Sequence, residues 1–251
     1  AVDGVRVAVI TSESTPFTRC YPMAKTAHFS RSLFEFLAEL GINNDREWFK
    51  ANRDWYIADV RDPMLAFVSD FAERLHTISP HYVADPRPVG GSMFRINRDI
   101  RFSKDKSPYK TNVGVHFRHE VGKEVHGPGF YMHLEPGGSF AGVGIWQPDS
   151  EILGKIRGAM DANPVKWERL LSDKGFSKQF EVEGDSLKRA PKGYDPDHPI
   201  IEHLKRKSHI ASTSYTEEQA CAPDFIDVFT EGCRTASPFT EFLTKAVGLT
   251  W

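Results

Sequence analysis

The chain has 251 residues, of which 40% are hydrophobic, 26% charged and 12% aromatic, and its formal net charge is −2 at pH 7. This composition is ordinary for a folded globular protein with enough apolar area for a core, and the length fits one large domain or two small ones. A pI near 6.6 argues against a dedicated DNA-binding protein. No apolar run approaches the roughly 18 residues that a membrane-spanning helix needs.

The three cysteines indicate a reducing compartment. Cys20, Cys221 and Cys233 are an odd number and form no Cys-x-x-Cys pair, so neither a disulfide framework nor a zinc knuckle is expected. The sequence therefore predicts a cytoplasmic protein. It points to no metal site and identifies no cofactor.

The first residues of the chain look like an addition to the folded part. An apolar hexad near the N-terminus is interrupted by Arg6, so it is too short and too polar for a secretory signal. The first recognisable helix begins near Ser30, and Met23 would make a natural start ahead of it. We therefore expect residues 1–27 to be a loosely attached leader or extension and residues 28–251 to form a single α+β domain.

Helical patterns dominate the N-terminal third. Ser30 is expected to cap the first helix, which Gly41 ends. Asn44 followed by Glu47 has the spacing of a capping box and opens a second helix. Pro63 is expected in the first turn of a third helix, where a proline costs no hydrogen bond. The apolar stripe of this third helix is Met64, Leu65, Phe67, Val68, Phe71, Leu75 and Ile78.

After residue 80 the hydrophobic period falls to two. Prolines and glycines break the helical pattern, and apolar residues then alternate with polar ones. The alternation predicts strands over residues 113–117, 130–134 and 140–146, and Pro136-Gly137-Gly138 is a turn signal between the last two. This antiparallel hairpin would have one apolar face and one polar face that carries Tyr131, His133 and Glu135.

Helical patterns return after the hairpin, first between residues 149 and 171. Thr216 and Gln219 form another capping box. Pro238 is expected to open the last helix, which Gly248 ends. Helices, then strands, then helices, without regular alternation, predict an α+β fold with N-terminal helices, a central mainly antiparallel sheet and C-terminal helices.

The chain concentrates its charge in residues 95–110. This segment carries +4, whereas the whole chain carries −2, so the remaining residues carry −6. A basic island in an acidic protein indicates a site for an anion. The six cations of the segment are Arg95, Arg98, Arg101, Lys104, Lys106 and Lys110.

Arginine and lysine suit phosphate and carboxylate groups, because a guanidinium offers two parallel donors and an ammonium a mobile point charge. The three arginines recur every third residue and would converge on one side in a helix or a tight turn. Acid–base chemistry would come from Asp99, with His133 or Glu135 on the polar face of the hairpin. The residues expected to hold a small, phosphate-bearing anion are Arg95, Arg98, Arg101, Lys106, Tyr109 and Lys110.

Two other interpretations stay open. The arginines could form an internal salt-bridge lattice with Asp99 and Asp105, in a structural or interaction protein without catalysis. Alternatively, the island could contact the phosphate backbone of a nucleic acid, although the acidic remainder of the chain weighs against this. Guanidinium groups that converge on a pocket shared with His133 and Glu135 would favour the small anionic ligand.

Better-known catalytic motifs are incomplete in this chain. Asn97-Arg98-Asp99 is similar to the His-Arg-Asp of protein kinases, but Lys104 stands where that loop needs asparagine. His133-x-Glu135 lacks the downstream Pro-Cys-x-x-Cys of zinc deaminases, and neither a Walker loop nor a Rossmann fingerprint is present. Together with Glu135, four histidines are spaced too irregularly to predict a two-histidine, one-carboxylate metal site: His116, His119, His126 and His133.

The basic segment resembles the motif of a known family. The pattern Arg-x-x-Arg-Asp-x-Arg-Phe-x-x-x-Asp-Lys-x-x-Tyr is met at every position from Arg95 to Tyr109. The chain is similar, over about residues 28–250, to a bacterial and fungal family catalogued as a domain of unknown function. The likeness extends to the Trp48-Phe49 helix, the hairpin and residues 187–194. The resemblance implies no established activity, cofactor or substrate.

Overall fold

The computed structural model describes residues 26–122 and 127–251. The N-terminal third is helical, as predicted, and comprises α1 (Arg31–Ile42), α2 (Arg46–Ala51), α3 (Arg53–Tyr56), a π-helical turn η1 (Ile57–Arg61) and α4 (Asp62–Ile78). The strands are β1 (Tyr82–Val83), β2 (Val113–His119), β3 (Gly129–Leu134), β4 (Phe140–Ile145), β5 (Glu181–Glu183) and β6 (His209–Ser214). The later helices are α5 (Ser150–Ala162), α6 (Pro164–Leu171), α7 (Lys174–Gln179), α8 (Ile201–Leu204), α9 (Glu217–Ala220) and α10 (Phe225–Ala246).

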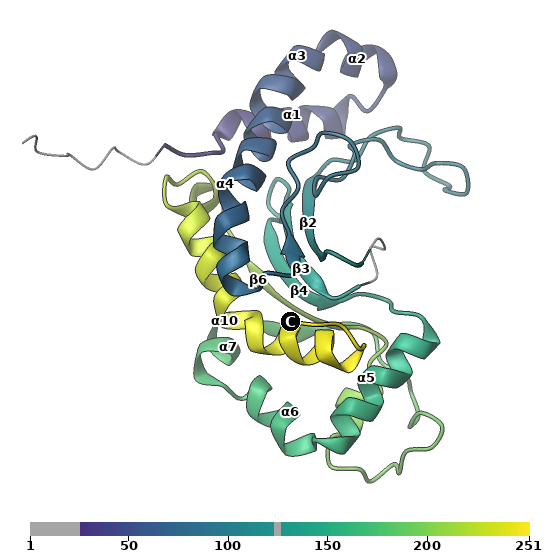
Figure 1. Ribbon diagram of the computed structural model, residues 1–251. Helices are drawn as coiled ribbons and strands as arrows, with labels where there is room; N and C mark the ends of the chain where they lie inside the picture. The colour runs from purple at the N-terminus through teal and green to yellow at the C-terminus, as the bar shows by residue number, and fades with distance from the viewer. Residues whose placement is uncertain (1–25, 123–126) are drawn as a thin grey trace, which may run out of the picture.

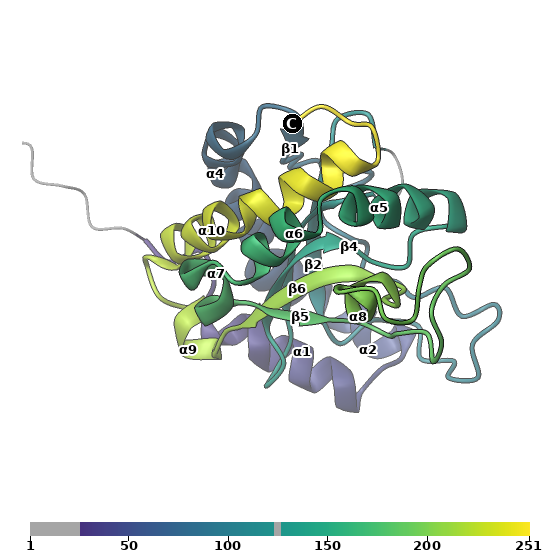
Figure 2. The same cartoon turned by 90° about the horizontal axis from the view of Figure 1, so that it is seen from below.

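The six strands form one antiparallel sheet in the order β1-β2-β3-β4-β6-β5. Helices α4 and α10 and the α5–α7 segment lie on one face of this sheet, and α1–α3 lie at one end of it, at the top of Figure 1 (Figures 1 and 2). The predicted α+β fold is thus confirmed. The leader expected over residues 1–27 lies almost entirely outside the described residues.

Strand alternation gives the sheet two different faces. Phe117 on β2 packs against Phe71 of α4, with 4.7 Å between ring centroids, and against Phe229 of α10. Because successive side chains of a strand point to opposite faces, the neighbouring His116 faces away from these helices. Its register partner on β3, Tyr131, lies on the same face. This second face is called the open face below.

The aromatic residues of α2 and α3 belong to the core. The ring of Phe36 on α1 lies within 6.3 Å, centroid to centroid, of the rings of Trp48, Phe49, Trp55 and Tyr56. These four rings are half-buried and pack against one hydrophobic cluster that includes the sheet. Aromatic burial of this kind stabilises the helical end, in agreement with their interpretation as core residues.

The predicted capping box at Asn44 is wrong. The N-cap of α2 is Asp45, whose side chain accepts hydrogen bonds from the backbone N–H groups of Glu47 and Trp48. The Asn44 amide instead donates to the carbonyl of Tyr109 and accepts from the N–H of Tyr109, both at 3.0 Å. The Asn44 side chain is thus used in a long-range contact with the backbone of Tyr109, whereas its spacing from Glu47 predicted a helix cap.

Two further helix boundaries in this third differ slightly from the prediction. The Ser30 side chain makes no capping bond, and α1 continues through Gly41 to Ile42. Pro63 does lie in the first turn of α4, but the chain before it is already helical: the N–H of Asp62 donates to the carbonyl of Ile57 across the π-helical turn. Helices α3 and α4 therefore run into one another instead of restarting.

The last helix is longer than predicted. It begins at Phe225, and Pro238 lies inside it. A proline has no N–H for the carbonyl four residues earlier, which is that of Arg234. The hydroxyl of Ser237 donates to this carbonyl at 2.8 Å and replaces the missing bond. The capping box of Thr216 and Gln219 is confirmed. None of the described helices is long and apolar enough to span a membrane.

Candidate functional site

Two neighbouring hollows lie on the open face of the sheet. The first, called the anion hollow, has a volume of about 480 Å³ and is lined by Phe94, Arg98, Asp99, Lys110, Asn112, Tyr131 and His133. The second, called the sheet hollow, has a volume of about 600 Å³ and lies over β3, β4 and β6. Phe94 and Tyr131 line both. The basic segment and the predicted polar face of the hairpin therefore meet at one place.

The basic segment is fastened to the edge of β2 and then projects as a loop. Met93 pairs with Val115, and the N–H of Phe94 donates to the carbonyl of Gly114. Asn97 then pairs with Tyr109 and closes the base of a loop over residues 98–108. Everything between these two residues extends beyond the sheet, on the right of Figure 1. The segment is neither a helix nor a single tight turn, so the three arginines take separate positions.

Two arginines are paired with carboxylates of the same loop. Arg98 forms an ion pair with Asp105, and Arg101 forms one with Asp99 at 2.7 Å. Hydrogen bonds from Arg101 lower the pKa of Asp99 to about 2, and hydrogen bonds from Ser107, followed by Arg98, lower that of Asp105. Both acids are therefore ionised at neutral pH. Among the described residues, the expected lattice is reduced to the Arg98–Asp105 and Asp99–Arg101 pairs, and the carboxylate of each pair is exposed.

Lys110 is the cation of the anion hollow that lacks a carboxylate partner among the described residues. Its ammonium lies 5.3 Å from the ring centroid of Phe94. Burial, and then the charge of Arg95, lower the pKa of Lys110. Arg95 itself is exposed and forms no ion pair in the described part of the chain. A half-buried ammonium beside a second cation is a position that an anion would stabilise.

The polar face of the hairpin forms a hydrogen-bonded relay. The hydroxyl of Tyr131 lies 3.0 Å from Nδ1 of His133, and Nε2 of His133 lies 3.1 Å from Oε2 of Glu135. The hydroxyl of Thr111 donates to the other carboxylate oxygen of Glu135 at 3.0 Å. An ionised Glu135 can only accept, so Nε2 carries the ring proton in a neutral His133 and Nδ1 accepts from Tyr131.

Within the relay, Tyr131 is the group placed to meet a ligand. Both ring nitrogens of His133 are occupied, whereas Tyr131 lines both hollows. Burial, and then the charge of Glu135, raise the pKa of Tyr131 to about 12. The hydroxyl therefore stays protonated at neutral pH, and it can donate this proton to a ligand when Nδ1 of His133 carries a proton of its own.

Of the six expected ligand-binding residues, only Arg98 and Lys110 line the anion hollow, and Arg95, Arg101, Lys106 and Tyr109 do not. Tyr109 is buried and stacks on Phe49 of α2, with 4.1 Å between ring centroids. Lys106 donates to the carbonyl of Ile100 within the loop. Arg101 lies outside the anion hollow, 76% exposed at its side chain. Tyr109 therefore joins the basic segment to the helical end, and Lys106 and Arg101 belong to the projecting loop.

The histidines are divided by the sheet. His116 lies on the open face, whereas His119 lies on the other, where its Nε2 lies 2.9 Å from the carbonyl oxygen of Thr250. His126 is outside the described residues. Within residues 26–122 and 127–251, no three histidine, cysteine or acidic side chains are grouped so that they could hold a metal ion.

Several residues of the site were not anticipated from the sequence. Phe94, Asn112 and Thr111 flank the basic segment and β2, and they carry no motif of their own. Gly114 opposes His133 in the register, and a Cβ there would lie 2.5 Å from the Tyr131 hydroxyl. The alternation of β2 places Gly114 and His116 on one face, and this was the only sequence signal available for either.

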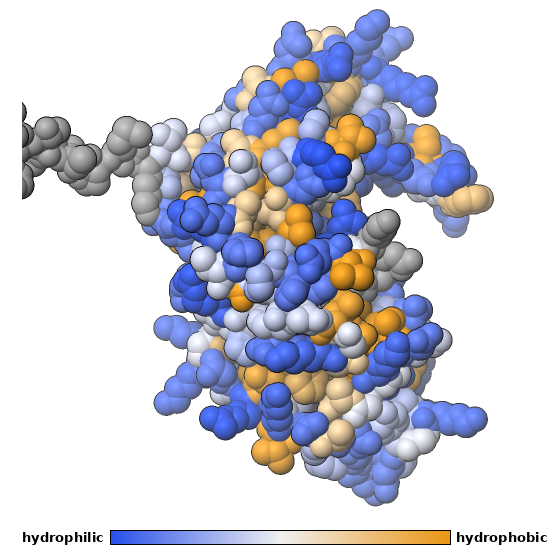
Figure 3. Space-filling model, viewed as in Figure 1, coloured by the Kyte–Doolittle hydropathy of each residue, from blue (hydrophilic) through white to orange (hydrophobic). Residues whose placement is uncertain are grey.

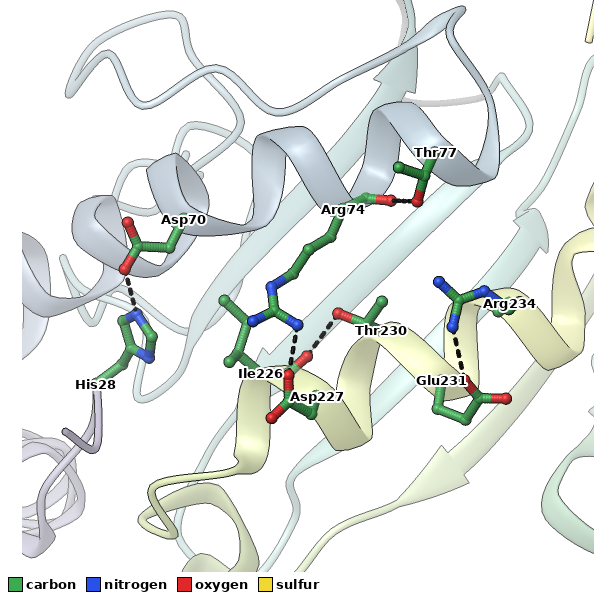
Figure 4. Close-up of polar contacts among 9 residues, drawn as sticks. All are labelled: His28, Asp70, Arg74, Thr77, Ile226, Asp227, Thr230, Glu231 and Arg234. Atoms are coloured by element: carbon green, nitrogen blue, oxygen red, sulfur yellow. Dashed lines mark hydrogen bonds and ion pairs between the residues drawn. The ribbon is translucent and has the colours of Figure 1, made fainter. Parts of the chain in front are cut away.

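A larger groove lies on the opposite side, between α4 and α10, with a volume of about 850 Å³. Figure 4 shows that its basic side chains are paired: His28 with Asp70, Arg74 with Asp227 and Arg234 with Glu231. Hydrophilic residues cover much of the surface on this side, and the hydrophobic ones form separate patches (Figure 3). Among the described residues that line it, the groove therefore offers no unpaired cation to an anion.

Comparison with known proteins agrees with the family resemblance of the basic segment. No curated protein matches the chain at a significant level. A family model described as a conserved hypothetical protein family, DUF2461, matches residues 32–242, which is well over half of the chain. This match includes the basic segment, the hairpin and α10 up to Phe242. The chain belongs to the DUF2461 family of conserved hypothetical proteins.

Proposed function

We propose that this protein binds a small phosphate-bearing anion in the anion hollow and exchanges a proton with it through Tyr131. The observation that carries the proposal is Lys110, a half-buried ammonium with no carboxylate partner among the described residues, in a hollow that also includes His133. Buried charges are normally paired. An anionic ligand would supply the missing partner and restore the ordinary pKa of Lys110.

The other charges of the hollow fit this role. Arg98 lines the hollow, and its pair with Asp105 is exposed on the Asp105 side, so a phosphate can compete for the guanidinium. The charge of Arg95 lowers the pKa of Lys110, so this guanidinium contributes to the positive potential at the ammonium. Asp99 also lines the hollow, but Arg101 balances its charge. Ionised Asp99 would act as a hydrogen-bond acceptor that orients the ligand.

The relay supports a proton-donating step. In this step His133 would carry both ring protons, with Nδ1–H donating to the oxygen of Tyr131 and Nε2–H donating to Glu135. Tyr131 would then pass its hydroxyl proton to an oxygen of the ligand and take the Nδ1 proton of His133, which is left neutral with its Nε2–H held by Glu135. His133 and Glu135 are thus positioning residues that act through Tyr131. Cys221 and Cys233 form no disulfide in the described chain, which supports the proposal that the protein works in the reducing cytoplasm.

Isothermal titration with inorganic phosphate tests the proposal. Lys110→Met should remove most of the heat of binding, because it keeps the aliphatic chain and deletes only the charge. Lys104→Met removes a charge from the same segment at an exposed position outside the hollow, and it should leave binding unchanged. Equal loss in both variants, or no phosphate binding by the unaltered protein, would overturn the proposal.

The same pair of variants separates the nucleic-acid alternative. If the loop met a phosphate backbone, a duplex oligonucleotide would bind with a steep salt dependence, and Lys104→Met would weaken it as much as Lys110→Met. A small-anion site instead predicts that only Lys110 matters.

A further inference from the structure

We infer that the ligand is elongated, with its anionic group at Lys110 and a planar, weakly polar ring in the neighbouring sheet hollow. The inference rests on the proposed function for the anionic end and goes beyond it for the ring. It assigns a role to the sheet hollow, which the charge of the basic segment alone does not explain.

The floor of the sheet hollow is made of backbone. Gly142 on β4 is the register partner of Tyr131, and Gly129 on β3 is the partner of Gly144 on β4. All three glycines line the hollow. Gly144 has a φ of 106°, and a Cβ there would lie 2.1 Å from the carbonyl oxygen of His209, so only glycine fits. Adjacent glycines leave flat peptide surface against which a ring can lie.

The walls of the hollow are aromatic. Phe94, Tyr131 and Phe140 line it, and the ring centroids of Tyr131 and Phe140 lie 5.7 Å apart. Phe140 also stacks on His133 of the relay, at 4.7 Å. Aromatic side chains gain most from a ligand with a π-face, in stacked or edge-to-face arrangement. Such walls over a glycine floor fit a planar ring better than a branched aliphatic or a sugar.

A buried polar group lines the sheet hollow beside Phe94 and Tyr131. His116 is only 7% exposed and lines the hollow. Its Nδ1 has no hydrogen-bond partner among residues 26–122 and 127–251, and its Nε2 lies over Gly129, where a Cβ would come within 2.5 Å. A buried polar atom without a partner costs free energy. A ring with a hydrogen-bonding group on its edge would meet the imidazole of His116.

The two hollows are placed for one ligand. Phe94 and Tyr131 are common walls, so the ring of the ligand would contact both side chains while its anionic group reaches Lys110. A volume of about 600 Å³ is within the range of small-molecule sites, on the order of 300–1,000 Å³, and holds a bicyclic ring. Tyr131, at the junction, would then have its hydroxyl beside the oxygen that joins the ring to the anionic group, and this oxygen would receive the proton.

The test compares inorganic phosphate, 1-naphthyl phosphate and 1-naphthol by isothermal titration. Burial of the naphthyl ring should make 1-naphthyl phosphate bind at least about tenfold tighter than phosphate. Gly142→Ala adds one methyl group to the floor of the hollow, and Gly142→Val adds three carbon atoms. The nearest atom to a Cβ at this position is 3.7 Å away, so the fold is expected to tolerate alanine, and the melting temperature shows whether the valine variant is folded. Both should reduce the advantage of the naphthyl compound, valine more than alanine, without changing phosphate binding.

The outcomes separate the inference from the proposed function. Phosphate binding that depends on Lys110, with no advantage for 1-naphthyl phosphate or no effect of Gly142→Val, would overturn the inference and leave the anion site standing. Binding of 1-naphthol that is abolished by Gly142→Val, without any phosphate binding, would overturn the proposed function and the single elongated ligand, leaving a ring site alone. A melting temperature close to that of the unaltered protein confirms that each variant is folded.

Discussion

The open face and the α4–α10 groove differ in how their charges are satisfied. The groove is the larger space, at about 850 Å³ against about 480 Å³ for the anion hollow. Its basic residues His28, Arg74 and Arg234 all have carboxylate partners, whereas Lys110 has none among the described residues. Paired charges hold elements together, and a half-buried unpaired charge favours a ligand. The state of the charges therefore indicates a binding site better than volume does.

The largest expected effect comes from acid, through the buried histidine of the open face. Burial, followed by the charge of Arg118, lowers the pKa of His116 from 6.5 to about 4. The unfolded chain therefore binds a proton between these values that the folded chain does not, and stability falls as the pH drops from about 6.5 to about 4. The loss attributable to His116 is on the order of 3 kcal/mol.

Chemical denaturation at pH 7 and pH 4.5 measures this loss. His116→Gln should flatten the dependence, while the similarly buried His209, whose pKa burial lowers to about 3, accounts for a part that remains. An identical pH dependence in the variant and the unaltered protein would show that His116 is not the group that titrates.

The next effect separates binding from structure within the basic segment. Arg98→Ala should weaken phosphate binding by roughly 1.5–3 kcal/mol, the range for a hydrogen bond to a charged group. It should leave the melting temperature nearly unchanged, because its partner Asp105 is exposed. If the melting temperature without ligand instead falls markedly, the arginines act as a structural lattice.

A third test concerns the relay. Gly114→Ala would place a methyl 2.5 Å from the Tyr131 hydroxyl, and such overpacking should lower the free energy of unfolding by about 1–3 kcal/mol. The same substitution at Gly154 in α5, where a Cβ meets nothing within 4 Å, should raise it by about 0.5–1 kcal/mol. Denaturant titration of both variants measures whether each substitution lowers or raises the free energy of unfolding. Equal effects would mean that Tyr131 moves aside freely.

The smallest effect is expected in the groove. Arg74→Met breaks the ion pair with Asp227. The side chains of Arg74 and Asp227 are each about one-third exposed, so the free energy of unfolding should fall by about 1 kcal/mol or less. Phosphate binding should not change, in contrast to Lys110→Met. A loss of phosphate affinity in Arg74→Met would remove the distinction drawn between the two regions.

The sequence predicted most of the elements because they depend on local patterns. Hydrophobic period, turn residues and the capping box at Thr216 gave the helices and the antiparallel hairpin. Errors arose where a distant or side-chain bond decided the outcome. Asn44 pairs with the backbone of Tyr109 rather than capping α2, and Ser237 lets α10 continue through Pro238. The spacing of residues along the chain predicts neither of these hydrogen bonds.

By itself, the sequence determined the place of the basic segment and the polar face of the hairpin, since composition and alternation follow from the order of residues alone. Only the tertiary structure decided which charges are satisfied. It pairs Arg98 and Arg101 within their loop, buries Tyr109 against Phe49, and leaves Lys110 without a carboxylate partner among the described residues, in a hollow that His133 also lines. The physical reason is that pairing depends on distances of a few ångströms between strands and loops, which the long-range packing of the sheet sets.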